Sequence, residues 1–118
     1  MSKLNDLMEA YKAVSELCEY RRIVETTMKD ALRALKTDPN SEELLAIYYN
    51  AKLDYERIDF IYKEAKAEYD ELYKKLKKDA SFLEQLKYTT DVPEEYRHFL
   101  SALRSDLGIA IGFEMGQE

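Results

Sequence analysis

The residues that could perform covalent or acid–base chemistry are few in this chain of 118 residues. His98 is its single histidine and Cys18 its single cysteine. A serine or cysteine nucleophile therefore has one possible histidine base, and a lone cysteine cannot form an intrachain disulfide. Cys18 falls on the apolar stripe of a predicted helix, where a thiol usually behaves as a small hydrophobic side chain. We expect no catalytic residue and no enzyme activity.

The sequence also offers few ligands for a metal or a cofactor. Glu95-x-x-His98 matches one ligand element of a di-iron helical bundle, but such a site needs two of these elements and two further Glu. A chain with one histidine cannot supply them unless a dimer combines two copies. A phosphate-binding loop needs glycine, and the first glycine of the chain is Gly108. We expect no metal and no cofactor.

The composition is that of a solvated helical protein. It combines 36% charged residues and a net charge of −6 with only three Gly and two Pro, which is typical of long helices with charged faces. The length fits a single domain, and the acidic balance argues against direct nucleic-acid binding. No apolar run could span a bilayer, and residues 1–12 lack a signal-peptide pattern. We therefore expect a cytoplasmic protein without a membrane segment.

Two long helices are expected around one strong turn signal. The run Thr37-Asp38-Pro39-Asn40-Ser41 predicts a turn at 37–41 between helices of about residues 3–36 and 41–78. Either Asp38, followed by Pro39 at the first helical position, or Asn40, with Glu43 three residues later, would cap the second helix.

The first helix carries an apolar stripe with a gap in its middle. The stripe is formed by Leu4, Leu7, Tyr11, Val14, Cys18, Met28, Leu32 and Leu35. Arg21 and Glu25 hold the positions in the gap, and we interpret them as an i,i+4 pair at the rim. Because a straight helix drifts against a seven-residue repeat, the buried face is expected to move onto neighbouring residues by mid-helix. These neighbours are Leu17, Tyr20, Val24 and Ala31.

The second helix has an unbroken seven-residue rhythm that predicts a helix–helix seam. The seam positions are Leu44, Tyr48, Ala51, Tyr55, Ile58, Tyr62, Ala65, Tyr69, Leu72 and Leu76. On the opposite side of the same helix lie Tyr49, Leu53 and Phe60, which a two-helix hairpin would leave in water. We expect another helix or another chain to cover them.

The remaining residues predict a short helix and a third helix. Ser81 with Glu84 forms a capping-box pattern for a helix at about 81–88, and Asp91 is the expected cap of a helix at about 92–113 before a tail at 114–118. The three glycines, Gly108, Gly112 and Gly116, are spaced by four. On a helix they would form one bare strip, which we interpret as a close-packing surface up to Gly112.

The sequence therefore predicts an all-α single domain, built on a long antiparallel helical hairpin of coiled-coil type and completed by a short helix and a third helix. We expect a non-catalytic protein–protein interaction module, such as an adaptor, an assembly factor or an inhibitor, that forms a homodimer. Its expected contact residues are Tyr49, Leu53 and Phe60, with Gly108 and Gly112.

Two further possibilities are open at this point. The first is an acidic nucleic-acid mimic that blocks a DNA-associated enzyme, with carboxylates such as Asp54, Glu56 and Asp59 in place of phosphates. The second is a resemblance: the helix start Asp38-Pro39-Asn40-Ser41-Glu42-Glu43-Leu44-Leu45 is similar to one in the small all-helical YlbF/YmcA family. Any helical hairpin can use these residues, so no functional residue is carried over from that family.

Overall fold

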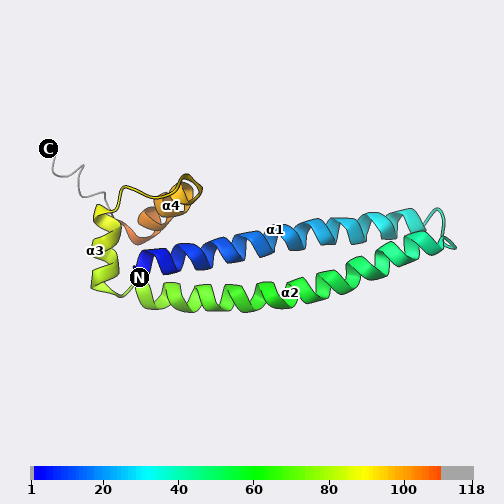
Figure 1. Cartoon of the computed structure of the whole chain (residues 1–118), viewed down its shortest axis with the longest axis horizontal. Helices are drawn as coiled ribbons and strands as arrows, with labels where there is room; N and C mark the ends of the chain where they lie inside the picture. Colours follow the sequence, from blue (N-terminus) through cyan, green and yellow to red (C-terminus); the bar gives the residue numbers. More distant parts are fainter. Residues whose placement is uncertain (1, 110–118) are drawn as a thin grey trace. The chain divides into compact units, whose positions relative to one another are not determined.

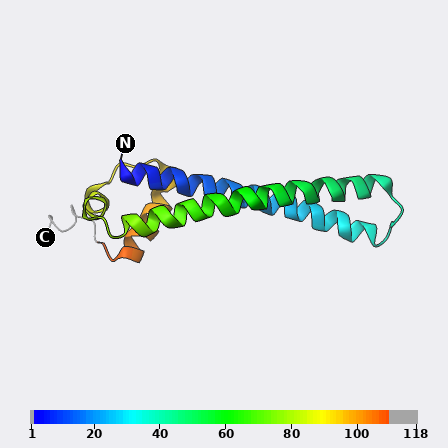
Figure 2. The same cartoon turned by 90° about the horizontal axis from the view of Figure 1, so that it is seen from below.

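The structure, a computed structural model, describes residues 2–109 of the chain (Figure 1). Its elements are α1 (Lys3–Leu35), α2 (Glu42–Leu76), α3 (Ala80–Tyr88), a 3-10 turn η1 (Glu94–Tyr96) and α4 (Arg97–Leu107). The described residues contain no strand. Helices α1 and α2 run side by side in opposite directions in both views (Figures 1 and 2). The predicted all-α fold with a long helical hairpin is confirmed.

The chain forms two compact units. Unit 1 combines Met1–Tyr11 with Glu68–Glu118, and unit 2 consists of Lys12–Ala67. Unit 2 is thus built from parts of α1 and α2 with the turn between them, while unit 1 combines the start of α1, the end of α2 and all of α3, η1 and α4.

The seam of unit 2 follows the heptad spacing of both helices. Val24, Ala31 and Ala51 are buried, and the tyrosines Tyr48 and Tyr55 are half-buried. The predicted shift of the α1 face onto Val24 and Ala31 is therefore confirmed.

Two members of the predicted α1 stripe lie outside this seam. Cys18 and Leu32 are exposed, so their assignment to the buried face is wrong. The cause is the heptad itself: the inward positions fall on Leu17, Val24 and Ala31, each one residue before a position of the predicted stripe.

The turn between α1 and α2 is where it was predicted, but its cap is a different residue. Ser41 Oγ accepts a hydrogen bond from the Leu44 backbone N–H at 3.2 Å, which is the bond an N-cap residue makes. Asp38 instead uses its backbone carbonyl, which accepts from the Ser41 N–H at 3.3 Å. The capping predictions for Asp38 and Asn40 are therefore wrong, because the first helical residue is Glu42.

Unit 1 has a true hydrophobic core. Its buried members come from α1, α2, α3, η1 and α4, and Phe82 and Leu86 of α3 lie at its centre with no exposed surface. The buried residues are Leu4, Leu7, Met8, Leu76, Phe82, Leu86, Tyr96, Phe99, Leu100 and Leu103. This core holds the N-terminal turn of α1 against segments that follow it by more than seventy residues.

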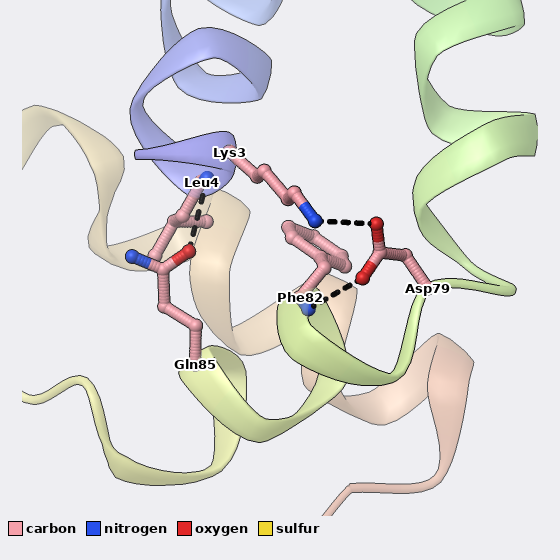
Figure 3. Close-up of polar contacts among 5 residues, drawn as sticks. All are labelled: Lys3, Leu4, Asp79, Phe82 and Gln85. Atoms are coloured by element: carbon pink, nitrogen blue, oxygen red, sulfur yellow. Dashed lines mark hydrogen bonds and ion pairs between the residues drawn. The ribbon is translucent and has the colours of Figure 1, made fainter. Parts of the chain in front are cut away.

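Polar contacts at the start of α1 reinforce this core (Figure 3). The Asp79 carboxylate accepts from the Phe82 N–H at 3.2 Å and from Lys3 Nζ at 2.6 Å. Gln85 Oε1 accepts from the free Leu4 N–H of the first turn of α1 at 3.2 Å. Asp79 is thus the N-cap of α3.

The predicted capping box of α3 is wrong, since Ser81 lies inside the helix. Asp79 offers a carboxylate acceptor that Lys3 already holds in place. This charge–charge contact lowers the pKa of Asp79, and its hydrogen bond from the Phe82 N–H contributes in the same direction.

The third helix is shorter than predicted and begins differently. Pro93 precedes η1 without any side-chain cap, so Asp91 does not start the helix. At the other end, Gly108 adopts φ +68° and its N–H donates to carbonyls of the last turn, which is the usual way glycine ends a helix. The predicted end at residue 113 is therefore wrong. Gly112, Gly116 and the tail lie outside the described residues, and the partner-contact role of Gly108 stays a prediction.

Candidate interaction surface

Apolar side chains on the outer side of α2 are the first feature of this surface. Tyr49, Leu53 and Phe60 are 56%, 58% and 63% exposed, and we call them the outer stripe. Leu53 and Phe60 are seven residues apart, so both point away from the seam that α2 shares with α1. Within unit 2 no described residue covers them.

A groove between the two helices of unit 2 is the second feature. It has a volume of about 300 Å³ and is lined by Val24 and Thr27 of α1 and by Ile47, Asn50, Ala51 and Asp54 of α2. The Asp54 carboxylate makes no hydrogen bond or ion pair with another described residue.

Exposed apolar residues extend this groove along both helices. Tyr20 and Ile23 precede Thr27 by seven and four residues, and Ile61 follows Asp54 by seven, so each continues the lining on its own helix. Tyr20, Ile23, Ile47 and Ile61 are all exposed, and we call them the groove face. The sequence reasoning missed this surface. The signal was available in the three-, four- and seven-residue spacing of these apolar residues outside the seam.

An ionic cluster crosses the seam between α1 and α2. Arg21 Nη1 lies 2.7 Å from Asp59 Oδ1, and Lys63 Nζ lies 2.9 Å from Asp59 Oδ2. The Arg21 guanidinium carbon is also 4.4 Å from the centroid of the Tyr62 ring. The hydrogen bond from Lys63, with that from Arg21, lowers the pKa of Asp59, and the bond to Asp59 raises the pKa of Arg21.

The interpretation of Arg21 and Glu25 as a rim pair is therefore wrong. Arg21 reaches across the seam, where Asp59 is a closer acceptor than the residue one turn away on its own helix. Glu25 pairs with Lys29 at 2.8 Å instead. Asp59 is already neutralised by two cations of the chain, which leaves fewer carboxylates of α2 for the mimicry of phosphates.

Unit 1 contains an aromatic pocket of about 320 Å³. Four rings meet there: Tyr11 from α1, Tyr69 and Tyr73 from α2, and Phe99 from α4. The Tyr11 and Phe99 rings stack with centroids 4.2 Å apart, and Phe99 meets Tyr69 edge-on at 6.3 Å. Tyr69 and Tyr73 lie nearly parallel with centroids 6.2 Å apart.

Two carboxylates complete the rim of this aromatic pocket. Asp70 and Asp106 line it together with Ala102 and Leu103. Burial, followed by the nearby groups Tyr73, Asp70, Tyr11 and Asp106, raises the pKa of Tyr69 to about 12. The potential around the Tyr69 hydroxyl is therefore negative, since neighbouring anions oppose its ionisation.

The residues singled out for chemistry are not brought together. Cys18 is an exposed free thiol on α1, and His98 is exposed in the first turn of α4. Within residues 2–109 no three His, Cys, Asp or Glu side chains are grouped as metal ligands. Over the same residues no helix combines the length and apolarity that a membrane span requires.

The fold places the chain among all-α proteins built on a helical hairpin. Comparison with protein-family models, with curated proteins and with solved structures finds no match to this chain. Its function must therefore be argued from its own surfaces.

Proposed function

We propose that the chain is a small, non-catalytic protein–protein interaction module that binds through the apolar surface of unit 2. The observation that carries this proposal is the distribution of exposed apolar side chains. All the large hydrophobic residues that the structure leaves exposed lie in unit 2, with the exception of Tyr88. Contiguous exposed apolar surface of this kind usually marks a binding site, because burying it is the main favourable term in association.

The interior of unit 2 explains why its outside is apolar. Its fully buried residues are Val24, Ala31 and Ala51, and two helices alone cannot enclose more. Helical hairpins commonly bury such surface by pairing into four-helix bundles. We therefore propose a homodimer in which the outer stripe or the groove face packs on a second copy, and a larger partner that uses the same surface. A reducing compartment such as the cytoplasm suits this proposal, because the exposed Cys18 thiol would persist there.

The test is the oligomeric state of the full chain by size-exclusion chromatography with light scattering. Phe60→Asp on the outer stripe and Ile23→Asp on the groove face each place a charge in one candidate interface. Thr26→Asp is the matched control, because Thr26 is exposed on α1 and belongs to neither surface.

We expect a wild-type dimer that one of the two interface variants dissociates and the control does not. Phe60 is 63% exposed, so its burial would contribute roughly 3 kcal/mol at ~25 cal/mol per Å² of about 125 Å², which is about a hundredfold in affinity. A chain that is monomeric at every concentration would contradict self-association. If affinity capture from the host also recovers the same proteins with Phe60→Asp and Ile23→Asp as with wild type, the interaction surface itself is wrong.

A further inference from the structure

We propose that the aromatic pocket of unit 1 binds a methylated ammonium group, as found in choline-like molecules and in methylated lysine side chains. The pocket lies entirely within unit 1, so this site is independent of the apolar surface of unit 2. Its lining combines the two features that recognise such a cation, namely aromatic rings and uncompensated negative charge.

The aromatic side of the pocket comes from three helices. Tyr11, Tyr69, Tyr73 and Phe99 are held by contacts with one another, with ring centroids between 4.2 and 6.3 Å apart. Phe99 is buried in the core, while the three tyrosines are half-buried and so keep ring surface at the pocket. A cation over such rings is attracted by the negative face of each π system, and the rings need no rearrangement before they bind it.

The electrostatic side of the pocket comes from Asp70 and Asp106. Both carboxylates line it, and no Lys or Arg is among its described lining residues. The ionisation of Tyr69 responds to both of them, which shows that their field reaches the rings. An anionic or phosphate-bearing ligand would meet repulsion here, whereas a cation gains from two charges outside the aromatic wall.

The apolar part of the lining favours a methylated cation over a bare ammonium. Ala102 and Leu103 join the rings around a volume of about 320 Å³, which is at the small end of ligand pockets. A primary ammonium is strongly hydrated and would lose water here without enough acceptors. A trimethylammonium head is weakly hydrated and presents methyl groups to the apolar wall while it keeps its charge.

The same head group has two sources, a free small molecule or a trimethylated lysine in a protein. The experiment therefore titrates the full chain with choline and, separately, with a short peptide that carries trimethyllysine. Amide and aromatic NMR shifts report binding at residues of the pocket. The uncharged analogue 3,3-dimethylbutan-1-ol, in which carbon replaces the nitrogen of choline, separates recognition of charge from recognition of shape.

We expect choline to shift the signals of Tyr69, Tyr73 and Asp106 and to bind roughly tenfold more tightly than its uncharged analogue. Tyr73→Leu should weaken choline about three- to thirtyfold, and Asp106→Asn about threefold. Tyr88→Leu and Glu84→Gln are the matched controls, because both residues are exposed on α3 and neither lines this pocket. Thermal unfolding by circular dichroism verifies that each variant is folded.

Binding of the peptide with at least tenfold higher affinity than choline identifies a protein ligand, and the reverse order identifies a small molecule; either result supports the site. Equal affinity for choline and the uncharged analogue overturns the proposal. So does the absence of shifts at the pocket with both cations, or a loss of binding in the control variants as large as in Tyr73→Leu.

Discussion

The half-buried Tyr69 hydroxyl makes the stability of unit 1 sensitive to alkaline pH. Its ring is packed among Tyr11, Tyr73 and Phe99, and burial, with neighbouring anionic groups, raises its pKa to about 12. In the unfolded chain the same hydroxyl ionises near the ordinary tyrosine value of about 10. The perturbation is a rise in pH, and the comparison is Tyr69→Phe, which keeps the ring and removes the titrating group.

The sign follows from the direction of the shift. Because the folded pKa is the higher one, the folded state holds the proton more tightly, and the contribution is fully present below pH 10. It is lost as pH rises from about 10 to 12, where the unfolded state gains by ionisation first. Two pH units correspond to at most about 2.7 kcal/mol. Tyr69 is only half-buried, so solvent screening reduces the expected loss to about 1 kcal/mol.

The assay is urea unfolding followed by circular dichroism at a series of pH values from 8 to 12 in roughly one-unit steps. Lysines and the other tyrosines titrate in both proteins, so the difference between wild type and Tyr69→Phe isolates one hydroxyl. We expect wild type to lose about 1 kcal/mol more than Tyr69→Phe over the upper part of this range. Parallel curves for the two proteins would refute the reasoning, as would a tyrosinate absorbance titration that places Tyr69 near pH 10.

Two further predictions concern the seam and the end of α4. Arg21→Met should lower the free energy of unfolding by about 1 kcal/mol through loss of the contact with the Tyr62 ring. The same change at Arg22, which is exposed, should cost less in urea unfolding, and equal losses would contradict a role for Arg21 in the seam. Gly108→Ala should cost about 1 kcal/mol in thermal unfolding, because alanine is strained at φ +68°. Gly108→Asn should recover part of this loss, and a neutral Gly108→Ala would show that the turn rearranges.

The sequence predicted the hairpin because helical burial repeats with a fixed period. In α2 the spacing from Tyr48 through Tyr55 to Tyr62 identifies one side of the helix without any knowledge of the partner. Caps are different, because several polar residues compete within a few positions. Ser41 was preceded by Asp38 and Asn40, and Asp79 stands two residues before Ser81. The backbone geometry of the turn decides between them, and spacing does not contain it.

The candidate sites depended on contacts between residues far apart in the chain. Asp59 is 38 residues from Arg21, so local reasoning paired Arg21 with Glu25 instead. The aromatic pocket joins Tyr11 and Phe99 from opposite ends of the chain. Each ring was visible in the sequence as a helical apolar residue, but only the fold shows that they meet. The outer stripe was predictable because all its members lie on one helix.

The contacts between the N-terminal turn of α1 and α3 also set the order in which the chain can fold. Lys3 meets a residue 76 positions later, and Leu4 meets one 81 positions later. During synthesis at roughly 5–20 residues per second, the first turn of α1 therefore waits roughly 4–16 s for its partners.

Meanwhile the part of α1 that belongs to unit 2 can pair with α2 as soon as that helix is made. This pairing shortens the effective loop that unit 1 must close and so lowers its entropic cost. Leu4, Leu7 and Met8 remain without their core until Phe82 and Leu86 arrive. The start of the nascent chain is thus an apolar segment that chaperones or proteases can reach first, and its protection is the last step of folding.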